Sequence, residues 1–231
     1  MSNTEKFELY SGPERPENGQ SDIELHGQNQ VLEMLATGQS LQATLDVLIQ
    51  KVEAQIDLIR GSIFTLDSSG KFFLTASAPN LPEEVCSAFD GFAVNENVGS
   101  CGPAVTYNKT IIVKNIQLDP KWDGFQEFAA NNKLGACWST PIRSVEGKVL
   151  GTFCCFFFEA REPTEDEMQK VHFAAYLAGI AIQMKIGEMA KRESEERNKR
   201  SLDQLRSIME GTASDTGDKF LQSLVFNLAD S

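Results

Sequence analysis

The sequence has few basic residues. Its 231 residues include 21 Lys and Arg against 33 Asp and Glu, which gives a formal net charge of −12. A protein that binds nucleic acid through phosphate contacts presents a basic face. The charge therefore argues against a nucleic-acid partner, and we expect none.

Histidine is also scarce. The chain has two histidines, His26 and His172, and neither belongs to a His, Cys or carboxylate cluster with metal-site spacing. Neither supports a Ser-His-Asp or Cys-His-Asn arrangement. We therefore expect no metal ion and no catalytic triad.

Long hydrophobic runs are missing. The longest, at residues 149–158, has about ten residues, whereas a membrane-spanning helix needs about 20. The N-terminal residues are polar and acidic and show no signal-peptide pattern. We expect a cytoplasmic domain without direct membrane contact.

The cysteines follow no regular framework, and their number, five, is odd. They are Cys86, Cys101, Cys137, Cys154 and Cys155. Disulfide scaffolds have an even number of cysteines at regular spacings. We therefore interpret these residues as reduced cytosolic thiols.

The apolar residues are nevertheless numerous enough for a sizeable core, because 41% of the chain is hydrophobic and it includes 15 Phe. Their spacing predicts a helix over 41–56 that begins after Ser40, and a capping box of Thr164 and Glu167 predicts the start of a last, long helix.

Strands are predicted at 62–66, 71–77, 111–113, 134–142 and 149–158, with short helical segments near 82–89, 102–107, 120–122 and 125–129. This order indicates an α+β domain with an antiparallel sheet and helices segregated to one side.

The last helix carries two apolar stripes on different faces. One stripe contains Met168, Val171, Ala175, Ala178, Ile182 and Met189, and the other contains Phe173, Leu177, Ile180 and Met184. One can pack on the sheet, and we expect the other to need a second helix or another subunit. A charged stretch at 191–200 follows, then an expected break at 211–217 and the start of a further helix from Lys219.

Composition divides the chain into four parts. Residues 1–27 are rich in Gly, Pro, Glu, Asn and Ser and are expected to form a flexible tail. A folded domain is expected at 28–187 and a charged helical linker at 188–210. Residues 211–231 are expected to begin a following domain or to form a disordered tail.

Three motifs between residues 99 and 142 carry a family resemblance. They are Gly-Ser-Cys-Gly-Pro-Ala at 99–104, Asp-Pro-Lys-Trp at 119–122 and Cys-Trp-Ser-Thr-Pro-Ile at 137–142. With Gly-Lys-Val-Leu-Gly-Thr-Phe at 147–153, they resemble the GAF domains of bacterial sensor histidine kinases and of GGDEF or EAL enzymes of cyclic-di-GMP signalling. The resemblance covers about residues 28–187.

The resemblance implies a six-stranded or similar antiparallel sheet, with the terminal helices on one face and ligand-pocket loops on the other. It also implies a homodimer through the terminal helices and a covalently linked output domain. The implied function is non-catalytic sensing of a small molecule, relayed through the last helix. The pocket candidates are Phe92, Cys101, Asp119, Trp122, Phe125, Trp138 and Ser139. On the strand, Trp138 and Thr140 share one face, and Cys137 and Ser139 share the other.

The ligand is not identified by the resemblance. Asn108 and Lys109 begin the pattern of cyclic-nucleotide GAF domains, but the Asp-Glu that should follow Phe125 is replaced by Ala129 and Ala130. The Cys-His pair of bilin-binding members is absent. We therefore expect neither cyclic GMP nor a covalent bilin.

Cys101 leaves two interpretations open. It precedes a predicted helix, where the helix dipole lowers a thiol pKa, so it could be a redox-active or ligand-contacting thiol. Packing as a small buried residue is the interpretation that we favour. The Gly-Ser-Cys-Gly motif also resembles free methionine-R-sulfoxide reductase, so a thiol enzyme using Cys101 is the alternative function, although Cys86 and Cys137 match that enzyme's other cysteines poorly.

Overall fold

The computed structural model describes residues 29–34 and 36–229, and the expected tail at 1–27 lies outside these residues. The chain divides into two compact units, one ending at Gln183 and one beginning at Met184.

The first unit is built on a five-stranded antiparallel sheet with the order β2-β1-β5-β4-β3. The strands are β1 (Ile59–Leu66), β2 (Phe73–Ser77), β3 (Ile111–Val113), β4 (Ala136–Arg143) and β5 (Val149–Phe157). The sheet therefore has one strand fewer than the six that the family resemblance suggested. The predicted α+β class with an antiparallel sheet is confirmed.

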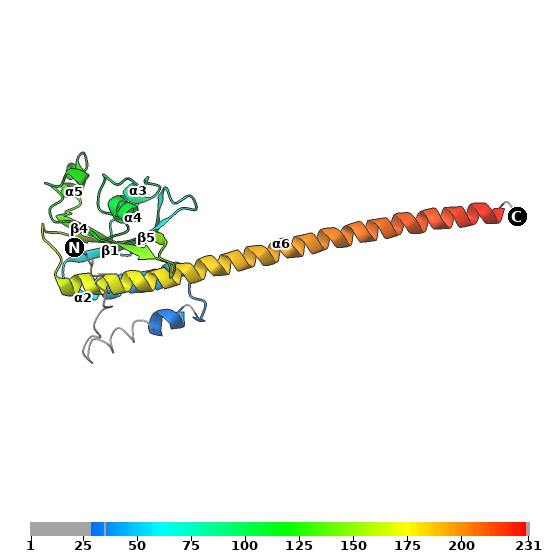
Figure 1. Cartoon of the computed structure of the whole chain (residues 1–231), viewed down its shortest axis with the longest axis horizontal. Helices are drawn as coiled ribbons and strands as arrows, with labels where there is room; N and C mark the ends of the chain where they lie inside the picture. Colours follow the sequence, from blue (N-terminus) through cyan, green and yellow to red (C-terminus); the bar gives the residue numbers. More distant parts are fainter. Residues whose placement is uncertain (1–28, 35, 230–231) are drawn as a thin grey trace, which may run out of the picture. The chain divides into compact units, whose positions relative to one another are not determined.

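Helices lie on both faces of this sheet, and each face has its own hydrophobic core (Figure 1). The helix side carries α2 (Leu41–Gln55) and the part of α6 up to Gln183, whose apolar residues pack with Ile63, Trp138 and Phe157. The loop side carries α3 (Glu83–Phe89), α4 (Cys101–Tyr107), the 3₁₀ turn η1 (Pro120–Trp122) and α5 (Gln126–Asn131). The terminal helices thus occupy one face and the expected pocket loops the other.

The predicted helix starts are confirmed in atomic detail. The Ser40 hydroxyl accepts a hydrogen bond from the Ala43 backbone N–H at 3.1 Å and caps α2. At the start of α6, the Thr164 N–H donates to the Glu167 carboxylate at 2.8 Å, and the Glu167 N–H donates to the Thr164 hydroxyl at 3.2 Å. These reciprocal bonds satisfy backbone donors that have no partner within the helix.

Strand β5 is buried on both faces, as its nearly continuous apolar sequence predicts. Its adjacent residues Cys154 and Cys155 belong to the loop-side and helix-side cores, respectively. On β4, Trp138 faces the helix side and stacks on Phe157 with a 3.9 Å centroid separation, whereas Cys137 faces the loop side. The alternation thus places the loop-side face of β4 toward the pocket loops.

Helix α6 (Glu165–Ala229) differs from the sequence expectation in one respect, because it continues through residues 211–217 without the expected break. Gly211 and Gly217 each cost a helix only about 1 kcal/mol relative to Ala, and residues 165–229 contain no Pro. Among the described residues, no helix combines the length and hydropathy needed to cross a membrane.

The two apolar stripes of α6 are largely satisfied inside the first unit. Val171, Ala178 and Ile182 of one stripe and Leu177 of the other are all buried in the helix-side core. Phe173 and Ile180 pack partly buried against the same core. Up to Gln183, the second stripe therefore finds its packing partners within this chain.

Candidate functional site

An apolar cavity of about 160 Å³ lies on the loop side of the sheet. Six of its lining residues are aromatic and come from β2, α3, η1, α5 and the loops between these elements: Phe73, Phe89, Phe92, Trp122, Phe125 and Phe128. Asn95, Lys121 and Cys101 are among the few lining residues with polar groups. A concave, mostly apolar space with a few polar groups is the usual composition of a small-molecule site.

Backbone hydrogen bonds hold the loops around this cavity. The Phe73 N–H donates to the Phe92 carbonyl at 2.9 Å, and the Gly91 N–H donates to the Phe73 carbonyl at 2.7 Å. The Gly99 N–H donates to the Lys121 carbonyl at 2.8 Å. The lining residues of the loops are therefore tied to β2 and to η1.

Two phenylalanine rings meet at the edge of the cavity. Phe92 and Phe125 make an edge-to-face contact with a 6.3 Å centroid separation, and Phe125 remains 38% exposed. Trp122, by contrast, is only 4% exposed. Phe125 therefore meets both the cavity and solvent, whereas Trp122 is enclosed.

Hydroxyl and thiol groups lie behind the cavity, where α4 meets β4. The Ser139 hydroxyl lies 2.8 Å from the Ser100 hydroxyl and 3.1 Å from the Cys101 sulfur. The Ser100 hydroxyl also lies 3.3 Å from the Cys137 sulfur. These contacts satisfy polar groups that the packing of α4 on the sheet has removed from water.

The thiols of this group differ in acidity. Hydrogen bonding from the Cys154 thiol, aided by the Ser139 hydroxyl and opposed by burial, holds the pKa of Cys101 below its ordinary value. Burial raises the pKa of Cys137 to about 12. Cys101 is only 5% exposed, so its acidity is combined with poor access for a large reactant.

The structure brings together four of the seven candidate pocket residues. Phe92, Cys101, Trp122 and Phe125 line the cavity. Ser139 lies behind Cys101 and does not line it. Asp119 caps η1 by accepting from the Lys121 N–H at 2.9 Å, and its carboxylate lies 3.5 Å from the Lys121 ammonium. Trp138 does not line the cavity, because its side chain is buried on the opposite face of the sheet.

Three aromatic lining residues were missed by the sequence reasoning: Phe73, Phe89 and Phe128. Phe73 lies in a predicted strand, and Phe89 and Phe128 lie in predicted short helices. Their apolar character could have been assigned equally well to the core. Within the described part of the chain, no three His, Cys, Asp or Glu side chains are placed to hold a metal ion.

The family model described as "GAF domain" matches residues 38–183. Among curated proteins, the chain is similar to the methyl sulfide methyltransferase-associated sensor of Methanosarcina acetivorans, with 37% identity over 170 residues. The matched segment is 74% of this chain but only 17% of that relative. The chain therefore spans a small part of the relative's length.

Solved structures show the same fold at low identity. The GAF domain of a phosphoenolpyruvate-protein phosphotransferase from Coxiella burnetii has a TM-score of 0.58 and 17% identity, covering 72% of this chain and 96% of that domain. Free methionine-R-sulfoxide reductase from Neisseria meningitidis, solved with its substrate, has a TM-score of 0.54 and 12% identity, covering 77% and 98%. At these identities, the likeness concerns the fold alone.

Proposed function

This chain belongs to the GAF domain family, and on that premise we propose that it senses a small apolar molecule bound in the cavity on the loop side of the sheet. The observation that carries the proposal is the aromatic lining of the 160 Å³ cavity. A cavity of about 150 Å³ lined by apolar side chains is large enough for benzene. The similarity to a protein named as a sensor supports a regulatory sensory role.

The proposed signal passes from the cavity to α6 through the sheet. Cys101 lines the cavity at the start of α4, and hydrogen bonding connects it to Ser139 on β4. On the opposite face of β4, Trp138 packs in the same core as Ala178 and Ile182 of α6. A ligand acts on α6 through this path only if it binds two arrangements of these residues with different affinity.

The remaining parts of the proposal concern the larger protein. We propose that this domain is non-catalytic and cytoplasmic and regulates an output domain of the histidine kinase or GGDEF/EAL type. What supports an output domain is the length of the relative, of which this chain covers 17%. What supports the output type is the resemblance of the motifs at 99–104 and 137–142.

Calorimetric titration of the whole chain with toluene and with dimethyl sulfide tests the binding step. The second probe is chosen because the relative's name associates it with a methyl sulfide methyltransferase, and sulfur makes favourable contacts with aromatic rings. We expect saturable binding of at least one probe. Val98→Phe should abolish it by filling the cavity, of which Val98 is a lining residue.

Leu118→Phe is the matched control, because Leu118 is 80% exposed and does not line the cavity. It should bind the probe as the unmodified chain does. Saturable binding that Val98→Phe and Leu118→Phe leave equally intact would exclude this cavity as the site. If the probe binds but hydrogen exchange over residues 165–183 does not change, the proposed relay is wrong.

A thiol enzyme using Cys101 is the second candidate function. It is favoured by the lowered pKa of Cys101 and opposed by the 5% exposure of that residue. Incubation with free methionine-R-sulfoxide and dithiothreitol as reductant distinguishes the two functions. Sulfoxide reduction that Cys101→Ala abolishes would support the enzyme, whereas no reduction by the unmodified chain would remove it.

A further inference from the structure

A second hollow, of about 610 Å³, lies on the helix side of the sheet. We call it the basic groove. It is formed by the segment entering β3, the end of β4 with the turn that follows, and residues 172–180 of α6. It shares no lining residue with the apolar cavity.

The groove differs in charge from the chain as a whole. Its lining includes Lys109, Arg143 and His172 and contains no Asp or Glu, although the net charge of the chain is −12. Glu146 lies between the lining residues Val145 and Gly147, and its carboxylate accepts hydrogen bonds from the Gln183 amide at 3.2 and 3.3 Å. The positive charge of the lining is therefore not neutralised by an acidic side chain of the lining itself.

The Arg143 guanidinium is held in a fixed position. Its Nε–H donates to the Asn108 side-chain oxygen at 2.7 Å, and Nη2 donates to the Asn108 carbonyl at 2.8 Å. Asn108 presents both acceptors because it ends α4 in the left-handed conformation, with φ of 50°. A guanidinium has five N–H donors, so three remain for a ligand after these two bonds. Among the described residues, no carboxylate lies within 4.0 Å of Arg143.

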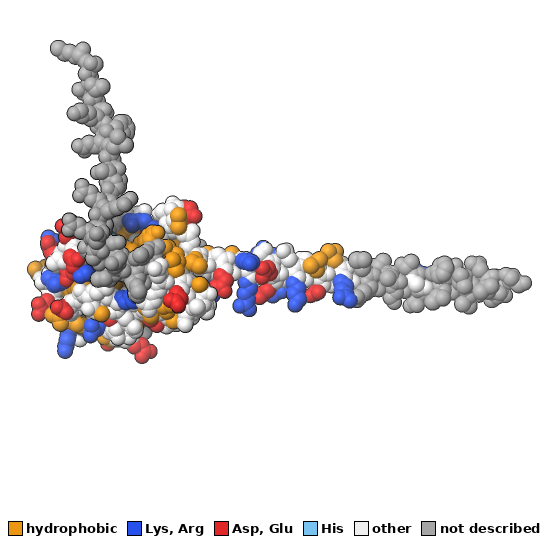
Figure 2. Space-filling model, turned by 90° about the horizontal axis from the view of Figure 1, so that it is seen from below, with side chains coloured by type: hydrophobic (Ala, Val, Ile, Leu, Met, Phe, Trp, Pro, Cys, Tyr) orange, Lys and Arg blue, Asp and Glu red, His pale blue; other side chains and the backbone are white. Residues whose placement is uncertain are grey.

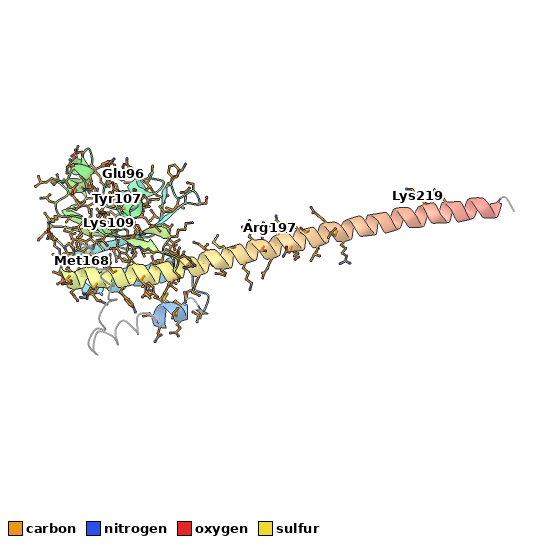
Figure 3. The ribbon with its side chains drawn as sticks, viewed as in Figure 1. Glu96, Tyr107, Lys109, Met168, Arg197 and Lys219 are labelled. Atoms are coloured by element: carbon orange, nitrogen blue, oxygen red, sulfur yellow. The ribbon has the colours of Figure 1, made fainter. Side chains whose placement is uncertain are left out.

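Lys109 is a lining residue of the groove. Its ammonium lies 5.5 Å from the centroid of the Tyr107 ring, and both residues are labelled in the first unit in Figure 3. An exposed cation–π contact contributes only about 0.5–1 kcal/mol. The flexible lysine stem can therefore turn its charge toward a bound anion.

His172 adds a third nitrogen group from α6. Its Nε2 lies 2.9 Å from the Thr110 hydroxyl, which lies 3.3 Å from the Thr140 hydroxyl. Burial, and then the positive charge of Arg143, lower the pKa of His172 below its usual 6.5. An anion between Arg143 and His172 would oppose the second of these effects.

Part of the remaining lining of the groove is apolar, and the groove is held in place by packing and hydrogen bonding. Pro141, Tyr176 and Ile180 contribute apolar surface, and Tyr176 is 56% exposed. Gly179 lets α6 approach the Arg143 carbonyl, because a side chain at this position would overlap it. The Val145 N–H donates to the Gln183 side chain at 3.0 Å and ties the β4–β5 turn to α6.

We propose that the basic groove binds a small organic oxyanion, a carboxylate or a phosphate with an apolar or aromatic part, through Arg143, His172 and Lys109. The Arg143 fork suits two oxygens of such an anion. The apolar surface of Pro141, Tyr176 and Ile180 would cover the rest of the ligand.

Calorimetric titration of the whole chain, in a buffer without phosphate or carboxylate, tests the proposal. The probes are phenyl phosphate and benzoate, with inorganic phosphate for the anion alone and benzyl alcohol as the neutral analogue. We expect saturable binding of phenyl phosphate or benzoate, weaker binding of inorganic phosphate and none of benzyl alcohol in this groove. The ratio of the dissociation constants of phenyl phosphate and benzoate identifies which oxyanion the groove prefers.

Arg143→Gln should weaken the binding by about tenfold or more, as expected for loss of a charge-assisted bidentate contact. His172→Gln, which leaves the Asn108 contacts of Arg143 intact, should weaken it less. Lys71→Gln is the matched control, because Lys71 is exposed and lines neither hollow. The substitution removes one positive charge, as Arg143→Gln does. Thermal unfolding of each variant verifies that it is folded.

Three results would overturn the proposal. The first is no saturable binding of either aromatic anion below about 10 mM, a weak limit for a specific contact. The second is that Val98→Phe, in which the apolar cavity is filled, binds benzyl alcohol as well as it binds the aromatic anions. The third is that Arg143→Gln and His172→Gln weaken binding no more than Lys71→Gln. Val98→Phe, which fills the apolar cavity, should leave phenyl phosphate binding unchanged, so the failure of one site is distinguishable from the failure of the other.

Discussion

Gly102 packs directly against the backbone of Asn95, with no room between them for a side chain. A Cβ at this position would overlap the Asn95 carbonyl oxygen. The contact presses the first turn of α4 against the loop that contains Asn95 and Val98, both of which line the apolar cavity. The glycine is therefore needed for close approach of two backbones, and its place in the motif at 99–104 follows from packing.

Gly102→Ala is expected to destabilise the chain by about 1–3 kcal/mol, because the added methyl forces the two backbones apart. The variant should also bind toluene more weakly, since Asn95 and Gly102 both line the cavity. Chemical denaturation and calorimetry measure the two effects. The control is Gly187→Ala on α6, where nothing lies within 4 Å of the added Cβ. That change should be neutral or stabilise by about 0.5–1 kcal/mol, and equal effects of the two variants would refute the packing argument.

A second close approach joins α6 to the end of β4. A side chain at Gly179 would overlap the carbonyl oxygen of Arg143, and helix backbone cannot move at one residue without moving its neighbours. We therefore expect Gly179→Ala to lower the free energy of unfolding by about 1–3 kcal/mol. It should also weaken phenyl phosphate binding in the basic groove, because Arg143 and Ile180, the residue that follows Gly179, line that groove.

The Gly187→Ala variant again supplies the comparison, because it adds the same methyl to the same helix in open space. If Gly179→Ala destabilises the chain but leaves phenyl phosphate binding unchanged, the position of α6 does not determine the affinity of the groove. If Gly179→Ala neither destabilises the chain nor weakens phenyl phosphate binding, the inference that α6 packs closely against the Arg143 carbonyl is wrong.

His172 should show a depressed pKa in an NMR titration, with its resonance assigned by comparison with His172→Gln. Burial is the larger cause and the charge of Arg143 the smaller. Arg143→Gln should therefore raise the pKa of His172 only part of the way toward 6.5, and bound phenyl phosphate should raise it in the unmodified chain. Arg143→Gln with an unchanged His172 pKa would contradict the proximity of the two groups.

The same shift makes a prediction about stability. Because the folded-state pKa of His172 lies below the unfolded value, the folded chain binds fewer protons in this range. The contribution of His172 to stability is therefore present above the unfolded pKa of about 6.5 and is lost as the pH falls through the folded value. Denaturation of the unmodified chain and of His172→Gln across this interval should show a smaller loss of stability in the variant. Parallel loss in both would contradict the prediction.

Local sequence patterns were sufficient for most of the fold. The caps at Ser40 and Thr164 are formed by residues close in sequence, so their partners could be identified before the structure was known. The apolar run at 149–158 indicated a strand buried on both faces, which is confirmed for β5. The break at 211–217 was wrong because Ser, Thr, Asp and Gly in that segment only weaken a helix, whereas Pro would end it.

The site was harder to predict, because its lining depends on which face of the sheet each residue meets. Alternation placed Trp138 and Ser139 on opposite faces, but only the tertiary structure shows that Trp138 lies away from the pocket loops. The basic groove left no local signal, since Lys109, Arg143 and His172 are far apart in sequence. Their meeting depends on the α4 C-cap at Asn108 and on the packing of Gly179 against Arg143.

The helix of the second unit carries exposed apolar residues that a second copy could cover. Along residues 191–200 the charges form i,i+4 ion pairs, including Arg192 with Glu196 at 3.2 Å. Beyond them Leu202 and Leu205 are 66% and 58% exposed, and Figure 2 shows hydrophobic side chains gathered at one place on this charged helix. Because removing exposed apolar side chains from water is favourable, we propose that two copies of the chain associate through this segment.

Light scattering coupled to size exclusion is expected to show a dimer of the unmodified chain at micromolar concentration. The double change Leu202→Glu with Leu205→Glu should raise the dissociation constant by at least about tenfold, because each buried Leu contributes about 1.5–3 kcal/mol and like charges would face each other. Ser201→Glu with Gln204→Glu is the matched control, since it adds the same charge on the same exposed turn. A monomeric unmodified chain, or equal dissociation of the two double variants, would contradict association through Leu202 and Leu205.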